Sequence, residues 1–126
     1  MRFALTAAAL AGGSAVVIGA AATHVLEAHV GALGAGWIET GLRWQAVHAL
    51  ALLGAAALAR PGTSMRWLAA AGWAWTAGIL LFSGTLYVMA LTGLRALGVL
   101  TPFGGLALIG GWGCMLLHAW REYPKD

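Results

Sequence analysis

The chain has 126 residues, of which 61% are hydrophobic and only 9% are charged, with a net charge of +3. A soluble domain carries about one quarter charged residues, so this chain has too little polar surface to cover a water-soluble globule. Disordered chains are poor in apolar residues and rich in charge, which excludes that class as well. The basic residues are scattered singly, so we expect no nucleic acid partner. The remaining class is a protein whose solvent is the lipid bilayer.

Four apolar stretches follow one another along the chain, at about residues 3–26, 40–59, 67–91 and 98–120. Crossing the hydrocarbon takes about 20 apolar residues, and backbone groups there need partners within the protein, which leaves helices or a closed barrel. The stretches lack the strict alternation of barrel strands. We therefore predict an all-α fold, an integral membrane bundle of four antiparallel transmembrane helices formed by residues 1–126 as a single domain.

The connections between these stretches are short. The first stretch resembles a secretory signal, because it follows Arg2 and ends in the small residues Ala20–Ala22, but we expect it to be retained as the first spanning helix. Residues Glu27–Glu39 form the longest connection, which is rich in glycine, and we expect a loop with a short interfacial helix around Trp37. Thr101–Pro102 stands near the start of the last helix, where proline is tolerated.

Positive charge predicts the orientation. With four spans, the two termini and the connection between the second and third stretches share one side of the membrane. That side carries Arg2, Arg60, Arg66, Arg121 and Lys125. The other side carries Arg43 and Arg95. Because cytoplasmic loops are enriched in Lys and Arg, we predict that both termini are cytoplasmic.

Small residues recur every four positions, as close helix packing in lipid requires. The longest row is Ala7, Ala11, Ala15, Gly19 and Thr23. We predict that helix packing uses Ala11, Ala15, Gly19, Gly78, Gly84, Gly104 and Gly105. We favour contacts within the chain over a dimer seam, and the last two glycines let the third helix approach the start of the fourth. Trp73 and Trp75, deep in the third stretch, are predicted to be packing residues.

Polar residues gather in the non-cytoplasmic half of the predicted bundle. The candidate polar site consists of His24, Glu39, Arg43, Gln45, His48, Ser83, Tyr87 and Thr101. Polar groups at membrane depth are costly, so they tend to face the bundle and each other. Glu39 and Arg43 are four residues apart and can pair as an interfacial clamp, with Arg43 snorkelling to the membrane surface. We expect His48 to face the interior.

His24 and His48 are the sharpest functional candidates. Two histidines at similar depth on neighbouring helices can ligate a metal or haem iron, or take part in proton or quinone chemistry. The structural alternative, which we favour, is that each bonds a neighbour such as Tyr87, Ser83 or a backbone carbonyl. No further ligand stands at helical spacing, so we expect no metal and no cofactor. Ser83 and Thr85 lack an aspartate to orient a histidine and a GxSxG motif, so we expect no catalytic residue.

Several sequence strings occur in the order found in one known family. The first half contains Gly19–Ala20, His24, Leu26, Glu39–Thr40, Arg43–Gln45, His48–Leu50 and Leu52–Leu53. The second half contains Phe82–Tyr87, Leu91–Gly93 and Thr101–Gly105. The chain resembles, over nearly its whole length, the membrane protein family catalogued as domain of unknown function 423, also called UPF0382, with eukaryotic relatives called transmembrane protein 256. It departs from the family pattern at Ala22, Thr23 and Trp44. The resemblance implies four spans and a bacterial inner-membrane location, and it implies no activity.

Two functional hypotheses follow. The first is a non-enzymatic structural or accessory membrane protein, acting as a homo-oligomer or as a subunit of a larger membrane complex. The second is a site in the non-cytoplasmic leaflet that binds a quinone, lipid or haem between His24, Arg43, His48 and Tyr87. A channel or transporter ranks third, because four short spans with no acidic residue in mid-membrane would need oligomerisation.

Overall fold

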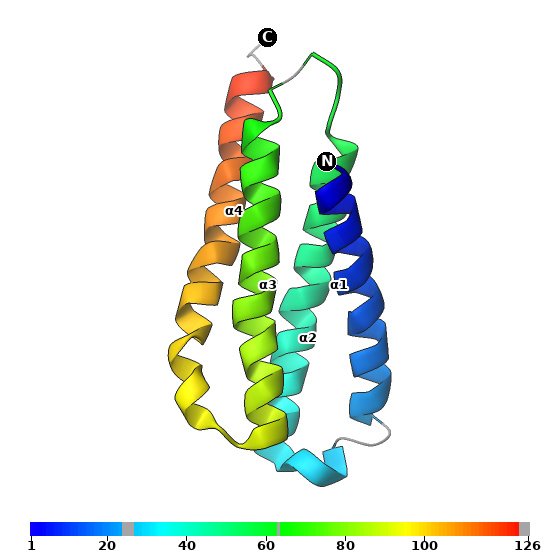
Figure 1. Ribbon diagram of the computed structural model, residues 1–126, viewed down its shortest axis with the longest axis vertical. Helices are drawn as coiled ribbons and strands as arrows, with labels where there is room; N and C mark the ends of the chain where they lie inside the picture. Colours follow the sequence, from blue (N-terminus) through cyan, green and yellow to red (C-terminus); the bar gives the residue numbers. More distant parts are fainter. Residues whose placement is uncertain (24–26, 63, 124–126) are drawn as a thin grey trace.

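The computed structural model describes residues 1–23, 27–62 and 64–123. It contains α1 (Arg2–Ala21), α2 (Glu27–Ala57), α3 (Arg66–Thr92), the short 3-10 helix η2 (Arg95–Val99) and α4 (Thr101–Glu122). These residues include no strand. Figure 1 shows the four long helices side by side, with the start of α1 and the end of α4 at the same end of the bundle. The predicted all-α bundle is confirmed.

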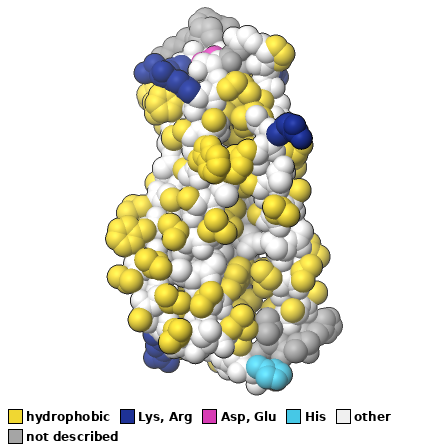
Figure 2. All heavy atoms as spheres, viewed as in Figure 1, with side chains coloured by type: hydrophobic (Ala, Val, Ile, Leu, Met, Phe, Trp, Pro, Cys, Tyr) yellow, Lys and Arg dark blue, Asp and Glu magenta, His cyan; other side chains and the backbone are white. Residues whose placement is uncertain are grey.

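The composition of the helices is that of a membrane protein. Three helical segments are long and apolar enough to cross a membrane, namely α1, α3 and the segment Arg95–Glu122 that joins η2 to α4. Helix α2 is not among them, because its polar side chains, Arg43, Gln45 and His48 included, lower its mean hydropathy. It nevertheless runs along the bundle beside the others (Figure 1). In Figure 2, apolar side chains cover the length of the molecule, whereas the arginines visible on this face lie toward its two ends.

Helix α2 begins earlier than the sequence predicted. Residues 27–39 were expected to form a loop, but they are helical apart from a kink at Gly31, whose φ of 67° and ψ of 175° favour glycine. The segment before the kink lies across the end of the bundle (Figure 1). Beyond it the helix continues because Ile38 packs inward, with 3% of its surface exposed. Trp37 is therefore part of α2, and no separate interfacial helix surrounds it.

The other boundaries also differ slightly from those predicted. Helix α1 ends at Ala21, and residues 24–26, including the predicted site residue His24, lie outside the described residues. The last stretch begins with η2, and α4 itself starts at Thr101 with a proline in its first turn. Proline is accommodated there because the first amides of a helix have no intrahelical acceptor.

Helix α3 lies at the centre of the packing. It contacts α2 and α4 along their lengths and α1 only slightly, while α1 packs mainly on α2. The side chains of Leu52, Leu68 and Trp75 are fully buried at these contacts. Trp73 faces outward, with 61% exposed, and its ring stacks on that of Phe3 at 3.8 Å between centroids. Residues two positions apart lie on opposite sides of a helix, so only Trp75 packs in the core.

Glycines allow α3 and α4 to approach each other closely. A Cβ atom at Gly78 would overlap the side chain of Leu108, and one at Gly111 would overlap the indole of Trp75. At Gly104 it would overlap the backbone of Phe82, which cannot move without displacing the whole helix. Helix association in lipid depends on such close contact, because acyl chains compete with apolar side chains for the same surface.

This contact predicts different consequences for two neighbouring glycines. Gly104→Ala should destabilise the bundle by about 1–3 kcal/mol, because α3 and α4 must separate to admit the methyl group. Gly105→Ala is the matched control, since its Cβ would lie at an ordinary 3.8 Å from the ring of Phe82. Thermal unfolding of both variants in detergent measures the difference, and equal melting temperatures would contradict the proposed packing.

Candidate functional site

The predicted polar residues divide into separate groups inside the bundle. Gln45 and His48 are both buried in α2, with 3% and 1% of their surfaces exposed. They lie three residues apart, yet Gln45 bonds to α1 and α3 whereas His48 bonds to α4. Because α2 lies between its neighbours, each of the two side chains joins it to a different part of the bundle.

Gln45 connects three helices through one carboxamide. Its Nε2 donates to the carbonyl of Ala11 at 2.8 Å and to Oγ of Ser14 at 2.9 Å, both in α1. Its Oε1 accepts from the hydroxyl of Tyr87 in α3 at 2.8 Å. The ring of Tyr87 lies against Gly41, where a Cβ would stand 2.6 Å from Cε1. Both protons of the amide and one acceptor position of its oxygen are therefore used within the protein.

His48 is held by two hydrogen bonds that define its tautomer. The indole Nε1 of Trp112 donates to Nε2 of His48 at 3.1 Å, and Nδ1 lies 2.8 Å from the carbonyl oxygen of Trp44. An indole can only donate and a carbonyl can only accept, so the ring is neutral with its proton on Nδ1. Trp75 completes an aromatic cluster with a centroid 5.1 Å from that of Trp112. Neither nitrogen of His48 is open to a metal ion without the loss of a hydrogen bond.

The hydroxyl groups of α3 also bond across helices. Oγ of Ser83 donates to the carbonyl of Gly41 at 2.8 Å, which joins α3 to α2. The hydroxyls of Thr85 and Thr101 lie 3.0 Å apart and join α3 to the start of α4. These contacts use the side chains for helix association, as hydroxyls in membrane helices commonly are used.

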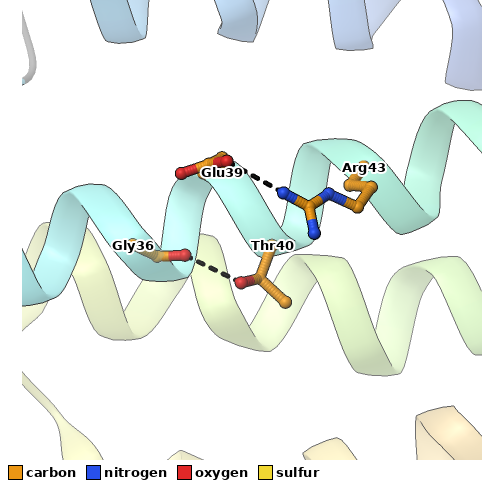
Figure 3. Close-up of polar contacts among 4 residues, drawn as sticks. All are labelled: Gly36, Glu39, Thr40 and Arg43. Atoms are coloured by element: carbon orange, nitrogen blue, oxygen red, sulfur yellow. Dashed lines mark hydrogen bonds and ion pairs between the residues drawn. The ribbon is translucent and has the colours of Figure 1, made fainter.

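Glu39 and Arg43 lie on the outside of the bundle. Arg43 donates from Nη2 to Oε1 of Glu39 at 2.9 Å, and the two side chains are 68% and 73% exposed, respectively. In Figure 3, Arg43 folds back along α2 toward Glu39, and Thr40 donates to the carbonyl of Gly36 one turn earlier. The pair thus bonds within its own helix and points away from Gln45 and His48.

The predicted site residues do not surround one cavity. Gln45 and Tyr87 line a groove of about 570 Å³ between α1 and α3, together with Ser14 and Gly84. His48 lines a separate cavity of about 210 Å³ on the α4 side, beside Trp112 and Phe82. Arg43 lines neither cavity. Among the described residues, no group of three or more His, Cys, Asp or Glu side chains is placed to hold a metal ion.

The small residues predicted for helix packing have unequal surroundings. Gly78 and Gly104 stand at close contacts between α3 and α4, and Gly19 meets Leu42 at 3.9 Å. Gly84 has nothing within 4 Å of an ideal Cβ and lines the α1–α3 groove. Ala11 and Ala15 are partly buried in α1, and Ala11 contributes the carbonyl that Gln45 binds.

Sequence reasoning missed several residues on which these contacts depend. The indole of Trp112 is the partner of His48, and the sequence did not predict this contact. Ser14 and Gly41 were not singled out, although each stands at a contact between helices. Gly111 was visible as a member of a four-residue repeat with Ala107. Nothing in the sequence marked Ser14, because its partner Gln45 lies 31 residues away.

Comparisons with known proteins find relatives that are named as membrane proteins. The family described as "Protein of unknown function (DUF423)" matches residues 18–105. The UPF0382 inner membrane protein YgdD of Escherichia coli K12 is 42% identical over 98% of this chain and 94% of its own length. The UPF0382 membrane protein of Haemophilus influenzae is 38% identical over 86% of each chain, and YwdK of Bacillus subtilis is 39% identical over 78% and 80%. No solved structure matches the chain.

The bond between Gln45 and Tyr87 predicts measurable coupling. Gln45→Leu and Tyr87→Phe should each destabilise the bundle, and the double variant should lose less than the sum, by about 0.5–2 kcal/mol. A double-mutant cycle of unfolding free energies in detergent measures this coupling. Thr40→Ala is the control, because its hydroxyl is exposed and bonds only within its own helix. Strictly additive effects would show that the hydrogen bond does not join α2 to α3.

Proposed function

The chain belongs to the DUF423 family of proteins of unknown function, and from that premise we propose that it is a non-enzymatic accessory component of the bacterial inner membrane. In this proposal the chain works by contact with other membrane proteins, as a homo-oligomer or within a larger complex. The buried polar side chains support a non-enzymatic role. Gln45, His48 and Ser83 already bond to other helices, so few of their polar atoms are left for a substrate.

The observation that carries the proposal is the exposed ion pair of Glu39 and Arg43. Helix α3 has 27 residues, and about 20 are needed to cross the hydrocarbon. Wherever that stretch begins, Ser83 falls within it, and Ser83 bonds to Gly41. Arg43 lies two residues beyond Gly41 along α2, and therefore further from the end of the bundle at which α3 ends at Thr92. Its backbone is therefore at hydrocarbon depth, while its side chain is 68% exposed on the outer surface.

A charged pair in this position favours a protein partner. Charged residues within membrane helices almost always face other protein or a water-filled cavity. The outer surface of α2 continues from the pair through Val47 and Leu50, which are 43% and 69% exposed. We infer that this surface, the α2 outer face, defined by Glu39, Arg43, Val47 and Leu50, contacts another membrane helix. That contact would cover the two charges and remove the cost of exposing them to lipid.

A second candidate function is the binding of a small molecule in the membrane. The α1–α3 groove supports it, because about 570 Å³ lies within the size range of small-molecule pockets and Tyr87 and Gln45 line it. A lipid or quinone suits this groove better than haem, because both nitrogens of His48 are engaged elsewhere. The predicted ligand site consisted of His24, Arg43, His48 and Tyr87. Among its described members, only Tyr87 would then line the groove that holds the ligand.

The proposal includes a topology in which both termini are cytoplasmic and α2 crosses the membrane in addition to α1, α3 and α4. Reporter fusions test it. A fusion at Arg60 should report the cytoplasm, and one at Arg95 should report the opposite side, because basic residues are retained on the cytoplasmic side. Two reporters are used, one active only in the cytoplasm and one active only outside it. Each is fused at both positions, and the two activities at each position give the measurement. Arg60 and Arg95 on one side would exclude the topology.

The partner is tested with a photo-crosslinking amino acid at Leu50 on the α2 outer face. We expect protein adducts from Leu50, and lipid adducts alone from the control position Ile109, which is 68% exposed on α4. Adducts whose masses are whole multiples of the chain indicate a second copy, and other masses indicate a different subunit. The same sample, extracted with solvent, tests the second candidate, because a quinone or lipid retained by the wild type and lost in Tyr87→Phe would favour it.

Charge reversal distinguishes a partner from an ion pair within the helix. Arg43→Gln and Glu39→Gln should each reduce the protein adducts. If the pair serves only its own helix, the exchanged variant with Glu39→Arg and Arg43→Glu restores the wild-type state. If a partner contacts the two charged side chains, the exchanged variant does not restore the protein adducts. A monomer that gives only lipid adducts and supports normal growth would overturn the accessory role.

A further inference from the structure

At the end of the bundle that holds both termini, two arginines from different helices meet on one tryptophan. The guanidinium carbon of Arg66, in the first turn of α3, lies 4.8 Å from the ring centroid of Trp67. The guanidinium carbon of Arg121, in the last turn of α4, lies 5.7 Å from the same centroid. Both arginines are exposed, and neither forms an ion pair with a carboxylate within the part of the chain that the structure describes.

Two further features of this end favour an anion. The indole Nε1 of Trp67 is buried and has no hydrogen-bond partner among the described residues. Helix α3 begins here without a side-chain cap, so the amides of its first turn point out of the helix with the positive end of its dipole. One acidic group is close, because the carboxylate of Glu122 accepts from the amide of Ser64 at 3.1 Å. This carboxylate reduces the net positive charge at this end of the bundle, but its single negative charge does not neutralise the two arginines.

We propose that Arg66, Arg121 and Trp67 form a binding site for a phosphate group, supplied by the headgroup of an anionic phospholipid. Two like charges held near one ring repel each other, and a phosphate between them replaces that repulsion with charge-assisted hydrogen bonds. Helix α3 is long and apolar enough to cross the membrane, and such a span would place its first turn at the level where lipid phosphates are concentrated. Tryptophan rings also prefer this level.

The charge of the site favours an anionic lipid over a zwitterionic one. The ammonium of a choline headgroup would add a third positive charge beside the two guanidinium groups. A glycerol headgroup adds none and presents hydroxyl groups as well. Each arginine near a membrane surface contributes about five-fold in affinity for an anionic lipid, equivalent to about 1 kcal/mol.

Native mass spectrometry of the full-length protein measures the retained lipid, with phosphatidylglycerol and phosphatidylcholine of identical acyl chains as probes. We expect stronger retention of phosphatidylglycerol. Arg66→Gln and Arg121→Gln should each reduce it about five-fold. Trp67→Phe, which keeps an aromatic ring and removes the N–H, should reduce it less. Glu122→Gln should increase retention, because it removes the one described carboxylate at this end while keeping an acceptor for Ser64.

Arg95→Gln is the matched control, since Arg95 is an exposed arginine in η2 at the opposite end of the bundle. It should leave retention unchanged. Equal retention of the two lipids, or equal losses in Arg66→Gln and Arg95→Gln, would overturn the site. Inorganic phosphate added in millimolar excess separates the two sources of the ligand. Failure to displace the lipid supports the headgroup, whereas binding of inorganic phosphate by a protein that retains neither lipid would assign the site to a soluble phosphate.

Discussion

Hydrocarbon offers no hydrogen-bond partner, so a polar group inside the membrane must find one within the protein. That constraint explains why the polar side chains of this chain also hold its helices together. Gln45 joins α2 to α1 and α3, and His48 joins it to α4. Ser83 adds a bond from α3 back to α2. Helix α2 is the least apolar of the four because it supplies most of these bonds, and its neighbours provide the hydrophobic length.

The same constraint applies to the polar side chains on the outer surface of the bundle. Glu39 and Arg43 bond to each other, but their side chains remain mostly exposed on α2. Arg66 and Arg121 share the ring of Trp67 without a described carboxylate partner. The two pairs lie in different halves of the molecule and differ in net charge. In the proposed topology, a neutral pair at hydrocarbon depth fits a protein neighbour, whereas two positive charges at a helix end fit the anionic surface of the membrane.

The sequence predicted the fold well because the length of an apolar stretch is a local property. Three of the four stretches are recovered as helices able to cross the membrane. The start of α2 was missed because glycines in residues 27–39 indicated a loop, while only Gly31 breaks the helix. Contacts across helices were predicted poorly, since identical residues have different surroundings. Gly110 faces open space and Gly111 faces the indole of Trp75, a difference that depends on how α4 is rotated.

Close approach and hydrogen bonding also depend on each other at individual positions. Ser83 reaches the carbonyl of Gly41 because Gly41 has no side chain to hold the helices apart. The ring of Tyr87 fills the same space, and from there its hydroxyl reaches Gln45. One missing side chain therefore supports two bonds between α2 and α3. Ser83 and Tyr87 belong to Phe82–Tyr87, one of the strings that resemble the family, so that string can be explained by helix association without any catalytic role.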